Sequence, residues 1–132
     1  MEAFNHWLEL PEDTLGSIIQ IIDMLHNASL LIDDVEDDSK LRRGSPAAHT
    51  IFGLGTTINS SNYVYFQALK IASEMDNRSA KRTNLVSVFV EEVLNLHRGQ
   101  GWDIHWRDQG VCPNMSEYED MVLDKTGESR RP

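Results

Sequence analysis

Five carboxylates stand within six consecutive residues, Asp33 to Asp38, at the end of a long apolar segment. If that segment is a helix, the run lies at its negative end, where each additional carboxylate costs about 0.3–1 kcal/mol unless a cation compensates it. Asp33 and Asp37 would lie on adjacent turns of one face, about 40° apart, so they could share a hard divalent cation. Magnesium suits such a pair, because it takes a few carboxylate oxygens and completes its octahedron with water or phosphate.

Basic residues and a histidine surround this acidic run. His26 shares the helical sector of Asp33 and Asp37, and Arg42 and Arg43 follow the run. Paired guanidinium groups fit phosphate oxygens, so metal-binding acids beside them suggest a diphosphate ligand. The alternative is a solvated helix end whose charge is screened by Lys40 and the two arginines, with His26 an ordinary packed or surface residue.

The elements that must position these residues are helices. The apolar residues recur with a helical period, and no sustained strand-like alternation is present, so the sequence predicts an all-α fold. A first helix is expected from Pro11 through Ile32, followed by a loop at Gly44-Ser45-Pro46. Further helices are expected over 58–72 and from Leu85 to Leu96, with continuation to Trp106. A last helix is expected where Ser116 and Glu119 form a capping-box pattern.

Composition limits the classes of partner. The 132 residues match a single domain, and a net charge of −9 with a pI near 4.9 disfavours nucleic acid and anionic lipid. The single cysteine, Cys112, cannot form an internal disulfide, which indicates a cytoplasmic protein. No apolar run approaches the roughly 20 residues of a transmembrane helix, and no signal peptide is evident, so we expect no transmembrane segment.

These motifs together resemble the trans-isoprenyl diphosphate synthase family, and within it the geranylgeranyl diphosphate synthases of animals. The resemblance covers nearly the whole chain. It rests on Leu25 to Asp37, Arg42-Arg43-Gly44, Ile58 to Phe66, Gly99-Gln100-Gly101-Trp102-Asp103 and Lys125-Thr126-Gly127.

The resemblance implies a partial isoprenoid-synthase helical bundle that condenses an allylic diphosphate, farnesyl diphosphate, with isopentenyl diphosphate. Its residue roles carry over position by position. By the resemblance, Asp33 and Asp37 bind Mg²⁺, and the allylic diphosphate is bound by Arg42, Lys125 and Thr126. Isopentenyl diphosphate is bound by His26 and Arg43, and the cavity is lined by Gln100 and Asp103. No side-chain nucleophile is needed, because the metal and cationic side chains stabilise the departing diphosphate.

Product length in this family depends on side-chain bulk ahead of the first aspartate. Ala28 and Ser29 occupy those positions, and their small size favours a C20 over a C15 product. The alternative is that these two residues permit close helix packing. Tyr63, Tyr65 and Phe66 similarly could line a prenyl pocket, form a subunit contact or serve an ordinary core.

The family pattern extends beyond the ends of this sequence. An earlier glycine-lysine-arginine segment and a second aspartate-rich motif have no counterpart here, so we expect residues 1–127 to form a partial synthase domain and 128–132 a divergent polar tail. We also expect exposed apolar surface and therefore a homo-oligomer or pairing with a full-length synthase. Two functions stay open: an active prenyltransferase, or a catalytically inactive truncated isoform that acts as an interaction subunit.

Overall fold

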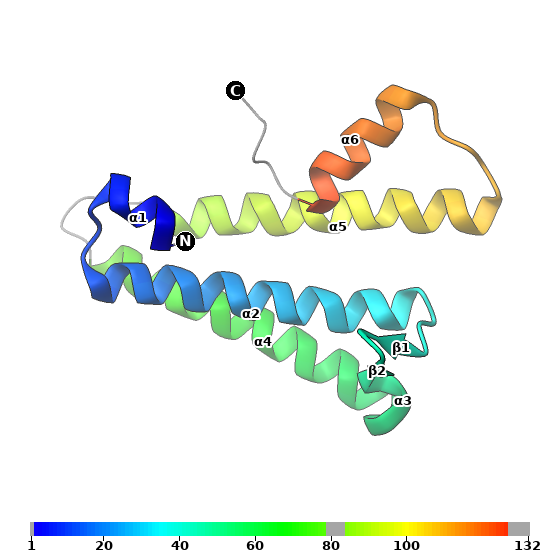
Figure 1. The fold of residues 1–132 in the computed structure, drawn as a ribbon, viewed down its shortest axis with the longest axis horizontal. Helices are drawn as coiled ribbons and strands as arrows, with labels where there is room; N and C mark the ends of the chain where they lie inside the picture. Colours follow the sequence, from blue (N-terminus) through cyan, green and yellow to red (C-terminus); the bar gives the residue numbers. More distant parts are fainter. Residues whose placement is uncertain (1, 79–83, 127–132) are drawn as a thin grey trace. The chain divides into compact units, whose positions relative to one another are not determined.

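The computed structural model describes residues 2–78 and 84–126 (Figure 1). The chain divides into two compact units, Met1–Leu85 and Val86–Pro132. The described part is helical apart from one two-stranded hairpin, which confirms the all-α class. The polar tail, 128–132, lies outside the described residues.

The first unit is an antiparallel helix pair with short elements around it. Helix α1 spans Glu2–Leu8, α2 spans Glu12–Glu36, α3 spans Ala48–Phe52 and α4 spans Leu54–Arg78. Between α2 and α3, strand β1 (Leu41–Arg42) pairs with β2 (Ser45–Pro46). Figure 1 shows α2 and α4 running side by side in opposite directions, with the hairpin and α3 at the C-terminal end of α2.

Helix α2 begins and ends near the positions that the sequence predicted. Pro11 precedes the first turn, where its missing N–H costs nothing, and Glu12 and Asp13 favour the positive end of the helix. At the other end the backbone N–H of Asp37 donates to the carbonyl of Asp33 at 2.9 Å. The acidic run therefore does lie at the negative end of a helix.

Small residues make the contact between α2 and α4. The buried residues of this unit are small: Ala28, Ala47, Thr57, Ser61, Ala68 and Ala72, together with the carboxylate-bearing Asp34. Ser61 is fully buried, and its Oγ donates to the carbonyl oxygen of Ala28 at 2.6 Å. Small side chains let the two backbones approach closely, and this hydrogen bond fixes their register.

Many large apolar side chains are exposed, as the sequence predicted. Trp7, Phe52, Tyr63 and Phe66 all face outward in the first unit. Of the aromatic cluster on α4, only Tyr65 is partly buried. The stability of this unit therefore depends more on the α2–α4 contact than on a core of large side chains.

The second unit contains α5 (Leu85–Gln109) and α6 (Met115–Thr126). The predicted helix over 85–106 is confirmed, with three further residues. The predicted cap of α6 is two residues too late, because Asn114 and Glu117 form the capping box. The Asn114 side chain accepts from the Glu117 N–H at 3.0 Å, and Glu117 accepts from the Asn114 N–H at 2.8 Å.

Helix α2 is the one described helix that is long and apolar enough, by length and composition alone, to cross a bilayer. The apolar runs of the sequence predicted no transmembrane segment. A core helix of a soluble protein meets the same criterion, and α2 packs along α4. Helix α2 is therefore a candidate membrane span by length and composition only.

Removing the buried hydroxyl between α2 and α4 should destabilise the fold. We expect Ser61→Ala to lower the free energy of unfolding by about 1 kcal/mol, because the Ser61–Ala28 hydrogen bond is lost inside a closely packed contact. Urea unfolding followed by circular dichroism measures this change. The exposed neighbour Ser60→Ala is the control, since it makes the same change in helix propensity. Equal effects of the two substitutions would refute the role of this hydrogen bond.

The Tyr65 hydroxyl should titrate at a higher pH than an ordinary tyrosine, and the fold should lose stability at alkaline pH as a result. Burial raises the pKa of Tyr65 from 10.0 to about 12, and the negative charge of Glu36 adds to the rise. The folded state then holds this proton while an unfolded tyrosine releases it, so stability should fall as the pH rises from about 10 to about 12. Absorbance at 295 nm should show a late tyrosine step that disappears in Tyr65→Phe and persists in Tyr63→Phe. A late step that survives Tyr65→Phe would contradict the assignment.

Candidate functional site

The hairpin after α2 returns the chain toward the acidic run. Leu41 pairs with Pro46 and Arg42 with Ser45, which leaves Arg43 and Gly44 as a two-residue loop. Both loop residues have positive φ, 52° and 82°, as a type I′ hairpin turn requires. The sequence predicted only a loop here. Glycine suits the second position because it adopts positive φ without steric cost.

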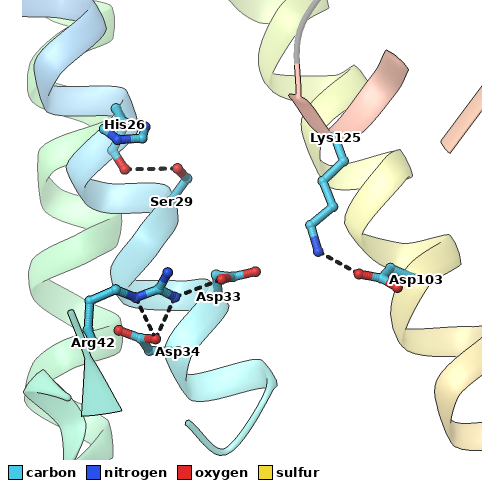
Figure 2. A network of polar contacts seen from close by, with 7 residues as sticks. All are labelled: His26, Ser29, Asp33, Asp34, Arg42, Asp103 and Lys125. Carbon is cyan, nitrogen blue, oxygen red and sulfur yellow. Dashed lines mark hydrogen bonds and ion pairs between the residues drawn. The ribbon is translucent and has the colours of Figure 1, made fainter. Parts of the chain in front are cut away.

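This turn places Arg42 against the aspartates of α2 (Figure 2). Its Nη2 donates to Asp33 Oδ2 at 2.9 Å, and its Nε donates to Asp34 Oδ1 at the same distance. The side chains are 35% exposed in Arg42, 24% in Asp33 and 4% in Asp34. The hydrogen bonds with Asp34, and then with Asp33, raise the pKa of Arg42 well above its ordinary range. The guanidinium is thus the compensating cation that the helix end requires.

Asp34 is a site residue that sequence reasoning left without a role. It is the most buried carboxylate of the acidic run and accepts two hydrogen bonds from Arg42. The signal was present in the motif: adjacent residues project about 100° apart on a helix, so consecutive aspartates can flank one guanidinium. What the sequence could not supply was the hairpin that returns Arg42 to them.

The other basic neighbours behave differently. Lys40 Nζ lies 2.6 Å from Asp38 Oδ1 in an exposed pair, and this hydrogen bond lowers the pKa of Asp38. Arg43 lies in the turn, and its side chain is exposed. Neighbouring cations therefore screen part of the negative charge of the acidic run, as the alternative interpretation predicted.

A divalent cation fits this helix end only with help from a ligand. Asp33 and Asp37 lie one turn apart and offer hard carboxylate oxygens. In residues 2–78 and 84–126, no group of three or more possible metal ligands comes together. A cation held here would need oxygens from water or a bound phosphate, which is the mode that magnesium favours.

The remaining predicted residues of α2 lie before the acidic run. His26 is exposed, and its carbonyl accepts a hydrogen bond from Ser29 Oγ at 2.9 Å. Ala28 is fully buried against α4, whereas Ser29 is partly exposed. The structure thus places Ala28 in the helix contact and leaves Ser29 as the more accessible of the two.

The second unit holds the other predicted residues in a group of its own, also drawn in Figure 2. Lys125 Nζ lies 2.5 Å from Asp103 Oδ2, which joins the end of α6 to α5. Gln100 has a buried amide nitrogen that finds no hydrogen-bond partner in the described part of the chain. The side chain of Thr126 lies outside the described residues.

Comparison with known proteins gives this geometry a context. The family model described as polyprenyl synthetase matches residues 1–131. A geranylgeranyl pyrophosphate synthase of Aspergillus flavus is 53% identical over 127 residues, which cover 96% of this chain and 36% of that protein. Similar values hold for the synthase of Hypoxylon pulicicidum (54% identity; 96% and 32% covered) and for synthase 1 of Zymoseptoria tritici (53%; 95% and 35%).

The chain therefore spans about a third of the length of these curated relatives. All three are fungal, so they support a likeness to geranylgeranyl pyrophosphate synthases and do not support the expected likeness to those of animals in particular. With a helical fold, the paired acidic and basic side chains at the end of α2, and a family match across nearly every residue, this chain belongs to the polyprenyl synthetase family.

Proposed function

We propose that this chain carries the allylic diphosphate half-site of a magnesium-dependent prenyltransferase of the geranylgeranyl diphosphate synthase type. The observation that carries the proposal is the Arg42 guanidinium held on Asp33 and Asp34 at the end of α2. This contact places a guanidinium, a group that suits phosphate oxygens, beside carboxylates, which suit a divalent cation. The similarity to synthases of that printed activity supports the substrate class.

In this proposal Asp33 and Asp37 hold magnesium through their carboxylates, while Arg42, Lys125 and Thr126 bind the allylic diphosphate. The metal, when bound, supplies positive charge that stabilises the diphosphate as a leaving group. Arg42 offers a planar set of donors that matches phosphate oxygens, and Lys125 offers a point charge. Both side chains act by positioning and by electrostatic stabilisation.

The second substrate in the proposal is isopentenyl diphosphate, bound by His26 and Arg43. Both side chains are exposed and therefore accessible to a ligand. The reaction is ionisation of the allylic C–O bond, attack of the isopentenyl double bond on the carbocation, and loss of a proton. Gln100 and Asp103 are proposed to line the cavity.

Product length is proposed to depend on Ala28 and Ser29. Because Ala28 is buried against α4, a larger side chain there would first disturb the helix contact. Ser29, which is partly exposed, is the position where added bulk could shorten a product without repacking α4. A cytoplasmic location is a further part of the proposal, supported by the single cysteine, Cys112, which calls for no oxidising compartment. So is a homo-oligomer or pairing with a full-length synthase, supported by the exposed apolar side chains of α4.

Diphosphate binding should depend on both magnesium and Asp33. Calorimetry with farnesyl diphosphate should show binding that strengthens at least about tenfold when magnesium is added, because a cation held by Asp33 and Asp37 would supply positive charge to the diphosphate. Asp33→Ala should abolish this gain. Asp38→Ala is the matched control, since Asp38 belongs to the same acidic run but pairs with exposed Lys40.

Three outcomes separate the proposals. If magnesium gives no gain, or if Asp38→Ala loses as much as Asp33→Ala, the metal assignment is wrong. An assay with labelled isopentenyl diphosphate, farnesyl diphosphate and magnesium then tests turnover. Product formed by this chain alone supports the enzyme and defeats the interaction-subunit alternative, whereas metal-dependent binding without turnover, together with co-purification with a full-length synthase, supports that alternative.

A further inference from the structure

Gly99 marks the closest approach of the two helices of the second unit. Figure 1 shows the C-terminal end of α6 meeting the middle of α5. A Cβ built on Gly99 would lie 2.6 Å from the backbone nitrogen of Lys125 and 2.9 Å from the carbonyl oxygen of Met121. Backbone atoms cannot rotate away as a flexible side chain can. Any residue other than glycine would therefore push the end of α6 off α5.

Charged pairs lie on both sides of this contact. Asp103, one helical turn after Gly99, holds Lys125 Nζ at 2.5 Å. On the other side, Arg98 Nη1 lies 3.8 Å from Asp124 Oδ2. Met121 is buried in the same unit. The depth at which α6 rests on Gly99 therefore sets whether the Lys125 amine reaches Asp103.

A second glycine in the same helix provides the contrast. Gly101 is exposed, and a Cβ built on it would meet nothing within 4 Å. Each glycine inside a helix costs about 1 kcal/mol relative to alanine. Of these two glycines, Gly99 is the one that offsets the cost with a tertiary contact, since a side chain at that position would prevent the approach of α6.

We propose that Gly99 is a positioning residue for Lys125: its missing side chain seats the end of α6 on α5 and so places the Lys125 amine against Asp103. This inference rests on the proposed function only for the task of Lys125, which is to bind the allylic diphosphate. The positioning itself is a property of the second unit and can be tested without any ligand.

The test compares Gly99→Ala with Gly101→Ala in the whole chain. In the magnesium-dependent calorimetry with farnesyl diphosphate, Gly99→Ala should weaken binding by about tenfold or more, as Lys125→Ala should. In both variants the diphosphate loses its charged hydrogen bond from the Lys125 amine. The double variant should bind no more weakly than Lys125→Ala alone. Losses that multiply would show that Gly99 acts independently of Lys125, and would overturn the inference. Gly101→Ala should bind as the unchanged chain does and unfold at a higher temperature.

A measurement on the unchanged chain covers the case in which Gly99→Ala does not fold. Nuclear Overhauser contacts should connect the Gly99 α-protons with the amide proton of Lys125, given the 2.6 Å approach of the Lys125 nitrogen to the Cβ position. Their absence from a folded sample would overturn the inference. If the contacts are present but farnesyl diphosphate does not bind, the proposed function fails while the positioning by Gly99 stands.

Discussion

The balance of charge at the C-terminal end of α2 is the constraint that organises the first unit. A helix that ends in five carboxylates places negative side chains on the negative end of its own dipole, and one of these side chains, Asp34, is buried. A buried carboxylate is costly unless it is paired and hydrogen-bonded. Arg42 meets that requirement through three hydrogen bonds to Asp33 and Asp34. The geometry of the hairpin allows the Arg42 guanidinium to reach back to the helix that precedes it.

The turn between β1 and β2 explains why a glycine follows the two arginines. A two-residue hairpin with positive φ at both central positions reverses the chain in the shortest distance, and Gly44 takes one of those positions at no cost. The same reversal separates the two arginines: Arg42 lies in the strand and contacts the aspartates, while Arg43 lies in the turn and faces solvent. Their adjacency in the sequence suggested a paired phosphate clamp, but the turn gives them different surroundings and so allows different ligands.

The four longest helices, α2, α4, α5 and α6, could be predicted from the sequence, because each is long enough for its apolar period to be recognised over several turns. Helices α1 and α3 could not, since they have only 7 and 5 residues. The hairpin could not, since strands of two residues, Leu41–Arg42 and Ser45–Pro46, are too short to show alternation. The cap of α6 was misplaced because Ser116 and Asn114 both precede a glutamate by three residues, and only the structure shows which pair bonds. The structural roles of Asp34 and Gly99 could not be recognised from the sequence for a different reason. Their importance depends on tertiary neighbours, Arg42 and the backbone of α6, which no local pattern reveals.

The two groups of candidate residues share one arrangement, in which a carboxylate holds the cation that is proposed to bind phosphate. Arg42 rests on Asp33 and Asp34, and Lys125 rests on Asp103. Such pairing fixes the direction of a long, flexible side chain before a ligand arrives, which lowers the entropy cost of binding. It also cancels the attraction for an anion: Asp33, Asp34, Asp37 and Arg42 sum to a charge of −2 within a chain whose net charge is −9. A diphosphate would therefore be repelled by this helix end, whereas one divalent cation would bring the local sum to zero. The proposed need for a divalent cation therefore has a physical basis in the pairing, because the contacts that orient the arginine leave this helix end negative.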